Sequence, residues 1–226
     1  MIDVKDLTKR YRVKGQTVEA LSGVSVQFPD GTYAGVTGPS GSGKSTLLFS
    51  LAGLVKPTAG AVTIDGQSVY DLPAGGRARL RAERIGFVFQ MFYLVPYLTV
   101  AENVAVALGA GPGGKTSADR VGAVLERVGL THRLNHKPGQ LSSGEQQRVA
   151  LARAVITQPR MILADEPTGN LDPDLAAQLL DYLDEFHRDG LTIILATHDQ
   201  KAAERATQRV TLQAGRLVEA EPDKRE

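Results

Sequence analysis

The sequence predicts an α/β fold with a mostly parallel central sheet, to which antiparallel strands are added. Two observations support this class. Residues 161–164 and 192–196 are continuous apolar runs, which are typical of strands buried on both faces of a parallel sheet. Between them, apolar residues recur at helical spacing from Leu175 to Phe186. The segment 161–196 therefore predicts a strand, a helix and a second, parallel strand.

The first forty residues predict antiparallel strands followed by a strand, a loop and a helix. Apolar and polar side chains alternate up to the turn at residues 29–31, which favours strands. The apolar positions are Ile2, Val4, Leu7, Val18, Leu21, Val24, Val26 and Phe28. Residues 33–37 predict a short strand, and after a glycine-rich turn a helix is expected from Lys44 to near Gly53 and Pro57.

The remaining elements follow in order. A second hairpin is expected at 61–64, with its turn at 65–66, and a strand at 85–89 whose Phe87 and Phe89 are expected in the core. Residues 91–154 are helical in character, with the glycine-rich stretch 109–114 as a loop tip. A closing hairpin is expected around Gly215.

Composition limits the possible functions. The 226 residues are 42% hydrophobic, enough for one large domain or two small subdomains. With 26 Lys and Arg against 25 Asp and Glu, the net charge of +1 provides no bulk field for nucleic acid or anionic lipid. The absence of Cys excludes disulfides and a cysteine nucleophile. Because a membrane-spanning helix needs about 20 predominantly apolar residues, none is expected.

The strongest motif fits G-x-x-x-x-G-K-[ST] between a predicted strand and a predicted helix. It consists of Gly38, Pro39, Ser40, Gly41, Ser42, Gly43, Lys44, Ser45 and Thr46. Glycines let the backbone wrap a phosphate with its N–H groups, and the helix N-terminus adds a positive dipole end. Lys44 would then reach the β- and γ-phosphates, and the Ser45 hydroxyl would bind Mg²⁺. The alternative, a flexible turn before a capped helix, is disfavoured by the flanking elements.

Two adjacent carboxylates, Asp165 and Glu166, end the apolar run at 161–164. Ligands of open α/β sheets bind at the carboxyl ends of the strands, so both side chains are expected at the phosphate site. Asp165 would anchor Mg²⁺ through a coordinated water, and Glu166 would polarise an attacking water. The alternative is that the two acids start a loop and cap the next helix.

A second helix start lies at Leu141-Ser142-Ser143-Gly144-Glu145. The spacing Ser142-x-x-Glu145 satisfies a capping box, and that can be its whole role. The alternative is a second anion site at a helix N-terminus. One nucleotide does not need two such sites, whereas two copies of the chain facing head to tail would use it.

Taken together, these segments resemble the ATP-binding subunits of ABC transporters. The Walker A segment is similar to residues 38–45, the signature to 141–147 and the Walker B segment to 161–165. Gln90 resembles the Q-loop residue, 169–172 the D-loop, and 197–199 the switch-histidine segment. The resemblance covers nearly the whole chain in the order of the family, and phrases at 86–90, 98–104 and 165–172 look closest to its lipoprotein-releasing and macrolide-efflux group.

This resemblance implies a fold and a domain organisation. The fold would be that of a P-loop NTPase, with a RecA-like, mostly parallel core, an antiparallel β subdomain and a helical subdomain. The whole chain, 1–226, would be one ABC ATPase domain. The core and the antiparallel subdomain would comprise 1–90 and 155–226, and the helical subdomain about 91–154.

The resemblance also implies roles for further residues. Tyr11 would stack on adenine with Val18 beside it, Gln90 would contact Mg²⁺ and the attacking water, and His198 would contact the γ-phosphate and hold Glu166 and the water in line. Asp172 would lie across a dimer interface. The alternatives are a half-buried sheet tyrosine, a polar strand end, a surface histidine and an N-cap before Pro173.

One position departs from the family pattern. Ser143 stands where the family usually has Gly, so that Leu-Ser-Ser-Gly-Glu replaces Leu-Ser-Gly-Gly-Gln. Ser142 and Gly144 still match. The added Cβ and hydroxyl of Ser143 lie next to the expected γ-phosphate contact, where they would affect closure of the dimer.

The implied function is an ATP-hydrolysing motor with Mg²⁺ as its cofactor. ATP would close a homodimer, and hydrolysis would open it. Five of the twelve aromatic residues fall within 87–97, and this stretch is either the core of the helical insertion or in part an exposed groove for a partner helix. For 92–98, the resemblance implies a socket for a cytoplasmic helix of a separate membrane permease. The subunit would be peripheral, on the cytoplasmic face of the inner membrane, with no nucleic-acid partner.

Three other functions were compared with this one. A P-loop kinase would need an acceptor pocket and would not use Ser142 or Asp172. An ABC ATPase that acts on nucleic acid or ribosomes typically carries coiled coils, tandem cassettes or basic arms, and the sequence shows none of them. An ATPase of a non-transporting mechanical membrane complex would share every residue named above.

Overall fold

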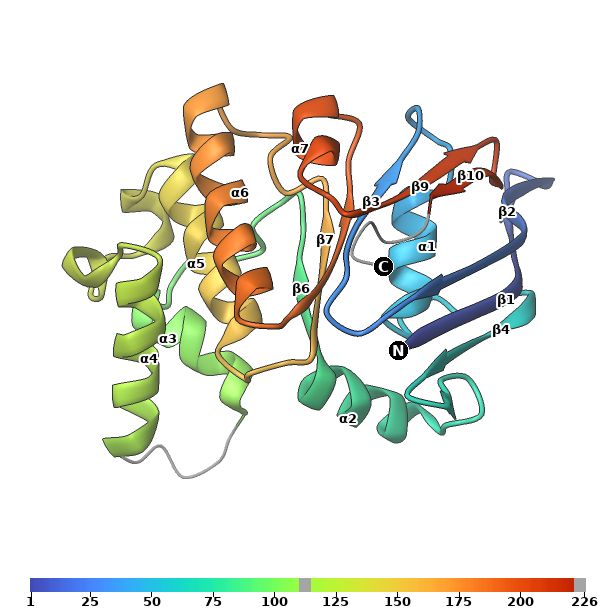
Figure 1. Cartoon of the computed structure of the whole chain (residues 1–226). Coiled ribbons are helices and arrows are strands. Elements are labelled where there is room, and N and C mark those ends of the chain that lie inside the picture. The colour runs from blue at the N-terminus through green and yellow to red at the C-terminus, as the bar shows by residue number, and fades with distance from the viewer. Residues whose placement is uncertain (110–114, 222–226) are drawn as a thin grey trace.

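The computed structural model describes residues 1–109 and 115–221, folded as two sheets with helices on both sides of the larger one (Figure 1). The strands are β1 (Ile2–Val13), β2 (Gln16–Phe28), β3 (Tyr33–Thr37), β4 (Ala59–Ile64), β5 (Gln67–Ser68), β6 (Ile85–Val88), β7 (Met161–Asp165), β8 (Thr192–Ala196), β9 (Gln208–Gln213) and β10 (Arg216–Glu221). The α-helices are α1 (Lys44–Leu51), α2 (Ala74–Arg84), α3 (Val100–Ala105), α4 (Lys115–Arg127), α5 (Ser143–Val155), α6 (Pro173–Arg188) and α7 (Gln200–Glu204). Short 3₁₀ helices are η1 (Val106–Leu108), η2 (Thr131–Arg133) and η3 (Pro138–Gln140).

The larger sheet has six strands in the order β10-β9-β3-β8-β7-β6. Neighbouring strands from β9 to β6 are parallel, and β10 pairs with β9 antiparallel. The registers place Val36, Ala164 and Ala196 close to one another at the carboxyl ends of β3, β7 and β8. The predicted α/β class with a mostly parallel sheet is confirmed, and this edge of the sheet carries the candidate site.

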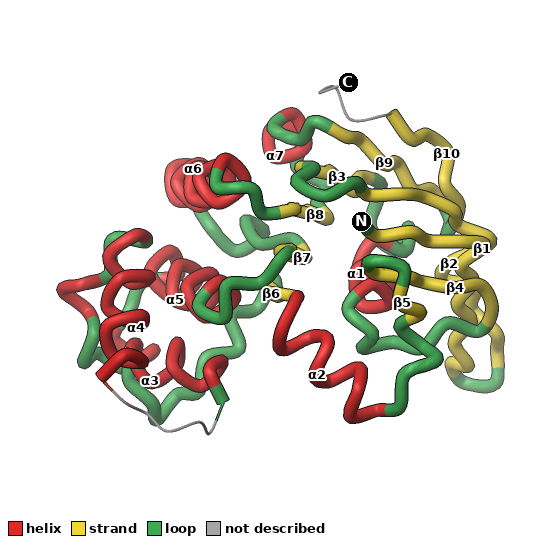
Figure 2. The backbone as a smooth tube through the Cα atoms, turned by 60° about the horizontal axis from the view of Figure 1, so that its bottom comes forward, coloured by secondary structure: helices red, strands yellow, loops and turns green. Residues whose placement is uncertain are grey.

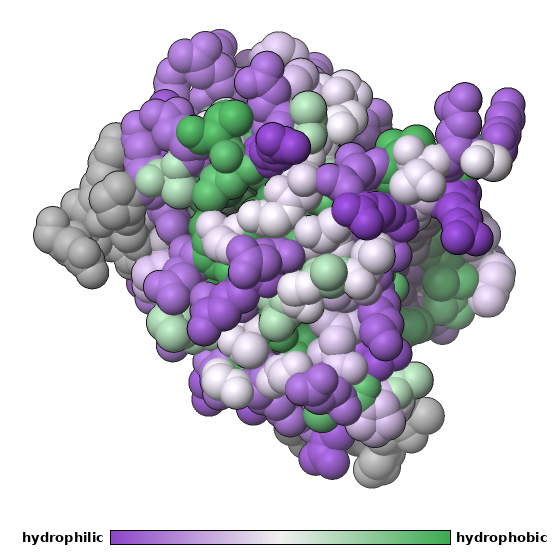
Figure 3. All heavy atoms as spheres, turned by 90° about the vertical axis from the view of Figure 1, so that its right-hand side faces the viewer, coloured by the Kyte–Doolittle hydropathy of each residue, from purple (hydrophilic) through white to green (hydrophobic). Residues whose placement is uncertain are grey.

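The smaller sheet is antiparallel, with the strand order β2-β1-β4-β5. It lies on the opposite side of α1 from the larger sheet (Figure 2). The long hairpin β1–β2 pairs Tyr11 with Val18 near its tip, and register shifts between Val4 and Arg10 mark irregularities within it. On the face toward the viewer in Figure 3, hydrophilic and neutral residues surround small separate apolar patches.

The alternation of side chains along the central strands divides the core into two clusters. Ile162, Ile193 and Leu195 face the cluster formed with α3, α4, α5 and α6. Leu163 and Ile194 face the other cluster, between the two sheets, where α1 contributes buried leucines. Because successive side chains of a strand point to opposite faces, an unbroken apolar run is the pattern that such a doubly covered sheet requires.

The segment 91–99 differs from the expectation. It is not helical, and α3 begins only at Val100, after an N-cap at Thr99 with a capping box to Glu102. Tyr93 adopts a positive φ of 46°, and the proline at 96 disfavours helical backbone at the residue before it. Buried Asn103 also binds the loop, donating to Val95 O at 3.1 Å. Most of the expected loop tip, residues 110–114, lies outside the described residues.

Two helices were not predicted from the sequence. In α2, only Leu80 is buried, so the helix carries almost no apolar periodicity. The short α7 begins at the N-cap Asp199, whose side chain accepts from the Lys201 N–H. None of the helices in the described part of the chain combines the length and hydropathy needed to span a bilayer.

Candidate functional site

The loop between β3 and α1 depends on glycine at two positions. Gly38 and Gly43 have φ values of 140° and 106°, in the region that L-residues rarely adopt. A Cβ on Gly38 would lie 2.1 Å from Leu212 O, and one on Gly43 would lie 2.4 Å from Ala20 O. Backbone packing and chain direction therefore both require glycine here, and the loop wraps the N-terminus of α1 as the motif predicts.

Lys44 is buried at the first turn of α1, and its ammonium group faces the loop. Its Nζ donates to Gly38 O at 2.9 Å and to Pro39 O at 3.3 Å. It also lies 3.4 Å from Glu166 Oε1, forming an ion pair. The cation, the helix N-terminus and the loop N–H groups together make an anion-binding cradle.

Ser45 and Asp165 meet at the end of β7. The Ser45 hydroxyl donates to Asp165 Oδ1 at 2.9 Å. Burial raises the pKa of the Asp165 carboxyl and Glu166 raises it further, against the hydrogen bond from Ser45 and the charge of Lys44. A buried carboxylate beside a hydroxyl offers the hard oxygen ligands that Mg²⁺ prefers. A bound Mg²⁺ would also offset the desolvation that disfavours the ionised form of the Asp165 carboxyl.

These residues fit a magnesium site of a particular kind. No group of three or more His, Cys, Asp or Glu residues in the described chain is arranged to hold a metal ion. Mg²⁺ commonly binds through one or two protein oxygens plus waters and substrate phosphates. The Ser45–Asp165 pair suits that mode, in which the nucleotide provides part of the coordination shell.

Glu166 is held at the carboxyl edge by its backbone and its side chain. Its φ is 47°, and its N–H donates to Ala196 O at 2.9 Å. Its carboxylate accepts a hydrogen bond from His198 Nδ1 at 2.8 Å and one from the His198 N–H at 3.3 Å. A non-glycine residue in this left-handed region costs about 1–3 kcal/mol and is frequent at functional sites.

A cavity of about 670 Å³ joins these residues. Its lining comprises Ala20, the loop residues from Pro39 to Thr46, and the side chains of Gln90, Glu166 and His198. Gln90 follows β6, and its carbonyl accepts from Asn170 Nδ2 at 3.0 Å. The structure therefore brings the predicted phosphate loop, Gln90, Glu166 and His198 to one place.

Other predicted residues do not line this cavity. Ser142 and Ser143 are exposed at the start of α5, where Ser142 and Glu145 form the predicted capping box. Gly144 is buried there, and a Cβ on it would lie 2.9 Å from the side chain of Leu175. Asp172 caps α6, accepting from the N–H groups of Asp174 and Leu175. For Ser142 and Asp172, the alternative predictions of a capping box and an N-cap therefore describe the contacts that the two residues make within one chain.

Tyr11 and Val18 form a cross-strand pair near the tip of the β1–β2 hairpin. Val18 is largely exposed, and Tyr11 is half-buried. Lys9 Nζ lies 4.9 Å from the centroid of the Tyr11 ring. An accessible aromatic face beside an apolar side chain is suited to stacking on a nucleobase.

The glutamate of the signature segment has a cationic partner. Arg133 Nε donates to Glu145 Oε1 at 2.8 Å, and the Ser142 N–H donates to Glu145 Oε2 at 2.8 Å. Burial opposes ionisation of this carboxyl, but these hydrogen bonds hold its pKa below the ordinary value. Arg133 was not predicted to take part in the site, and only the unusual acid at 145 points to a need for it.

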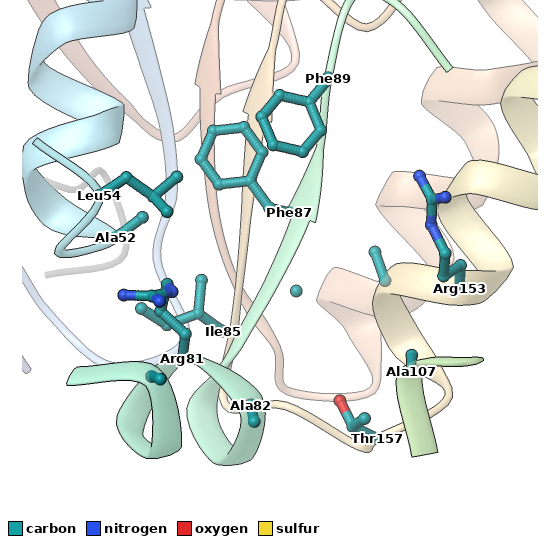
Figure 4. Close-up of a pocket in the computed structure, with 13 residues that line it drawn as sticks. Ala52, Leu54, Arg81, Ala82, Ile85, Phe87, Phe89, Ala107, Arg153 and Thr157 are labelled. Atoms are coloured by element: carbon teal, nitrogen blue, oxygen red, sulfur yellow. The ribbon is translucent and has the colours of Figure 1, made fainter. Parts of the chain in front are cut away.

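A second cavity, of about 390 Å³, lies between the end of α1, α2, β6 and α5 (Figure 4). The rings of Phe87 and Phe89, stacked with centroids 4.2 Å apart, form one wall, with Leu54 nearby. Both phenylalanines are half-buried rather than fully buried, and Phe87 packs against the cluster between the two sheets. Arg153 lines the opposite side and donates to Phe92 O and Tyr93 O at 2.8 and 2.7 Å.

Gln147 is a second residue near the site that the sequence analysis did not predict. It is fully buried in α5, and its amide contacts the segments that carry Gln90 and Glu166. A signal was present, because Gln147 lies four residues before buried Leu151 and so on the apolar face of its helix. A polar side chain at a core position calls for a partner.

A glycine-rich loop, a buried lysine and a Ser–Asp oxygen pair at the carboxyl edge of a parallel sheet are the arrangement of a P-loop NTPase. Residues 21–169 match the family described as "ABC transporter". The chain belongs to this family, as the sequence predicts, and is one of its ATP-binding cassettes.

Relatives and solved structures agree with this assignment. The lipoprotein-releasing system ATP-binding protein LolD of Geobacter metallireducens is 42% identical over 220 residues, which cover 96% of this chain and 98% of that protein. The macrolide export ATP-binding/permease protein MacB of Hyphomonas neptunium is 43% identical over 219 residues, which cover 96% of this chain but 34% of that protein. The chain thus spans about a third of the length of this MacB relative.

A dimeric structure of the ATP-binding cassette MJ0796 in a post-hydrolysis state, bound to ADP and Pi, has a TM-score of 0.91 with this chain. The two are 37% identical, and the match covers 98% of each. The P-loop NTPase fold of ATP-binding cassettes follows from this match.

Proposed function

We propose that the chain hydrolyses ATP to ADP and phosphate as the motor subunit of a membrane ABC transporter. The Glu166–His198 hydrogen bond beside the Lys44 cradle is the observation that carries the proposal. It places a base and its orienting partner next to the group that would hold the triphosphate, which is the arrangement that phosphoryl transfer to water needs. The kinase alternative is not favoured, since the relatives are ATP-binding subunits.

In this mechanism each residue has one task. The loop from Gly38 to Thr46 binds the phosphates through its N–H groups, and Lys44 compensates the charge of the β- and γ-phosphates. Glu166 takes a proton from the attacking water, and His198 holds Glu166 and the γ-phosphate in line. Tyr11 and Val18 support the adenine ring.

Mg²⁺ is the proposed cofactor, held by Ser45, Asp165 and Gln90. When bound, it neutralises charge on the phosphate oxygens. Asp165 contributes a carboxylate that the Ser45 hydroxyl already orients at 2.9 Å. Gln90 approaches from the segment after β6, where Asn170 fixes its carbonyl.

We further propose a homodimer that closes around ATP. The signature residues Ser142, Ser143, Gly144 and Glu145 do not line the cavity of their own chain, and Ser142 and Ser143 are exposed at a helix N-terminus. A second copy facing head to tail would bring them to the γ-phosphate, with Asp172 at the interface. Hydrolysis would remove the contact that favours the closed state and so open the dimer.

We also propose that the movement of the dimer reaches a separate permease through the second cavity, whose wall is formed by Phe87 and Phe89. Its wall of stacked aromatic rings is apolar, and Met91, Tyr93 and Tyr97 are exposed in the segment that follows. An apolar helix of the permease would bury these side chains. The subunit would then be peripheral, on the cytoplasmic face of the inner membrane, and its transporter would be of the lipoprotein, macrolide or lipid export group.

The proposed organisation is one ABC ATPase domain over 1–226. The core and the antiparallel β subdomain comprise 1–90 and 155–226, and the helical subdomain comprises about 91–154. In support, α3, α4 and α5 contact one another on one side of the larger sheet, in a hydrophobic cluster that also joins them to α6 and to the sheet.

A trapping experiment tests the dimer. Glu166→Gln should bind Mg-ATP without turning it over, so light scattering after gel filtration should give twice the monomer mass with Mg-ATP and the monomer mass with Mg-ADP. Lys44→Ala combined with Glu166→Gln is the matched control and should remain monomeric. A Glu166→Gln chain that binds Mg-ATP and stays monomeric at every concentration would refute the proposal.

A further inference from the structure

Gln147 connects three parts of the molecule through one buried amide. It lies in the first half of α5 and is 0% exposed. Its Nε2 donates to Pro167 O at 2.8 Å and to Phe89 O at 3.2 Å. Pro167 directly follows Glu166, and Phe89 directly precedes Gln90. The helix that begins at the signature segment is thereby tied to the backbone beside both of these site residues.

The helix α5 meets β6 at a second point. A Cβ on Gly86 would lie 2.3 Å from Ala154 O, so helix and strand are in close contact there. From Gly86 to Phe89 a strand rises about 10 Å, and from Gln147 to Ala154 a helix rises about 10.5 Å. The two contacts are therefore spaced alike along both elements, and displacement of α5 must move the carbonyl of Phe89 or break its hydrogen bond.

The segments after β6 and β7 are also tied to each other. Asn170 Nδ2 donates to Gln90 O at 3.0 Å, and a Cβ on Gly169 would lie 3.1 Å from Gln90 Nε2. Gln147 holds one end of this pair of segments, and Asn170 holds the other. The Gln90 and Glu166 backbones thus respond together to the position of α5.

Stability alone does not explain a glutamine here. Gln147 Oε1 is buried and has no hydrogen-bond partner among the described residues. An unsatisfied buried acceptor is unfavourable, and an apolar side chain of similar volume would avoid that cost. The donor end of the amide is the part that makes hydrogen bonds, to Phe89 O and Pro167 O.

We infer that Gln147 is a positioning residue for hydrolysis, which fixes Gln90 and Glu166 relative to the helix that presents Ser142. This inference rests on the proposed function, because Ser142 acts on the nucleotide of a second copy. Docking of Ser142 on that nucleotide sets the position of α5. The hydrogen bonds of Gln147 then fix Gln90 and Glu166 of its own chain relative to this helix. Each half of the dimer then becomes competent for hydrolysis when its signature segment is engaged.

The test compares Gln147→Met with a matched control, Gln208→Met. Gln208 is also buried, donates through Nε2 to Gln27 O at 2.9 Å and leaves Oε1 without a partner. It lies at the start of β9, opposite Ala34 and away from the carboxyl edge. Both substitutions remove a buried amide donor, and only one of these donors is tied to the site.

For Gln147→Met we expect kcat for ATP hydrolysis to fall about tenfold, or 1.4 kcal/mol, with KM and nucleotide affinity within about twofold of the wild type. Gln208→Met should keep the wild-type kcat even where its melting temperature falls. A wild-type kcat in Gln147→Met, or equal kcat losses in both variants, would overturn the inference.

A second variant provides a rescue and covers the case in which Gln147→Met does not fold. Gln147→Glu keeps the side-chain length, and only its protonated form offers a donor. Its kcat relative to that of the wild type should therefore rise between pH 8 and pH 6, and a constant ratio would contradict the inference. A Glu166→Gln chain with the wild-type Gln147 that binds Mg-ATP and stays monomeric would instead refute the proposed function, so that the two failures are distinguishable.

Discussion

Nδ1 of His198 donates a 2.8 Å hydrogen bond to the Glu166 carboxylate, although 32 residues separate them in the chain. The two follow β7 and β8, which are neighbours in the sheet, and the Glu166 N–H continues the pairing by donating to Ala196 O. Parallel pairing therefore brings the base and its partner together. His198 is exposed, so the pair faces the cavity in which a triphosphate would bind.

Glu166→Gln should lower kcat by roughly 10²–10⁴-fold, the usual contribution of a general base. The amide keeps the shape of the side chain but cannot accept the proton of the attacking water. Phosphate release by the purified variant measures the loss, and titration with a fluorescent ATP analogue checks that affinity is retained. Turnover at the wild-type rate would show that another group is the base.

Lys44→Ala should abolish high-affinity nucleotide binding. The buried ammonium group lies 3.4 Å from Glu166 Oε1, and its removal would leave a bound triphosphate without this cation and Glu166 with His198 as its remaining partner. The same ATP-analogue titration should show at least a tenfold weaker Kd, with Lys5→Ala, on the exposed face of β1, as a control for general charge loss. Equal affinity for Lys44→Ala and wild type would reject the phosphate cradle.

Asp165→Asn should stabilise the ligand-free protein while it removes Mg²⁺-dependent hydrolysis. Because burial raises the pKa of Asp165, the folded state holds its proton more tightly than the unfolded state. The stability due to that proton is present below the unfolded pKa and is lost as the pH rises through the folded pKa, so at pH 7 the charge is a net cost.

The expected gain at pH 7 is about 1 kcal/mol, or roughly 2–4 °C in Tm for a domain of this size. The difference in stability between variant and wild type should shrink as the pH falls through the folded pKa of Asp165, below which its side chain is neutral like asparagine. Differential scanning calorimetry without nucleotide measures it. A variant less stable than the wild type at pH 7 would contradict the role of burial.

Arg133→Ala should remove about 0.5–1 kcal/mol from the free energy of unfolding, as expected for a partly exposed ion pair. Because hydrogen bonds hold the Glu145 pKa down, its contribution is present above the unfolded pKa, about 4.5, and is lost as the pH falls through the lower folded pKa. The effect of the substitution should therefore vanish in acid.

Urea unfolding of Arg133→Ala, Glu145→Gln and the double variant at pH 7 completes a double-mutant cycle. A coupling energy near zero at pH 7 would show that the 2.8 Å contact between Arg133 and Glu145 contributes nothing. The same cycle repeated at decreasing pH should give a coupling energy that falls toward zero as the pH passes below the folded pKa of Glu145.

Much of the fold was predictable because it depends on local patterns. The apolar runs became β7 and β8, the glycine motif became the loop before α1, and Ser142-x-x-Glu145 became a capping box. Each of these features is specified by neighbouring residues, through alternation along a strand, the conformational freedom of glycine or hydrogen bonds at a helix start.

The segment 91–99 shows what such patterns miss. Its apolar composition suggested helix, whereas its backbone is bound by side chains from elsewhere: Arg153 holds Phe92 O and Tyr93 O, and Asn103 holds Val95. The two bonds from Arg153 depend on the position of α5, sixty residues along the chain, and no local window contains them.

The sequence by itself determined that this chain has a phosphate loop, two acids after a buried strand and a helix start with a capping box. Tertiary structure alone decided that the Glu166 carboxylate meets His198, that Arg133 neutralises Glu145, and that the Gln147 amide spans the segments of Gln90 and Glu166. The reason is physical: residue type and spacing fix what the backbone does locally, while a hydrogen bond between distant side chains exists only once sheet order and helix packing set its distance.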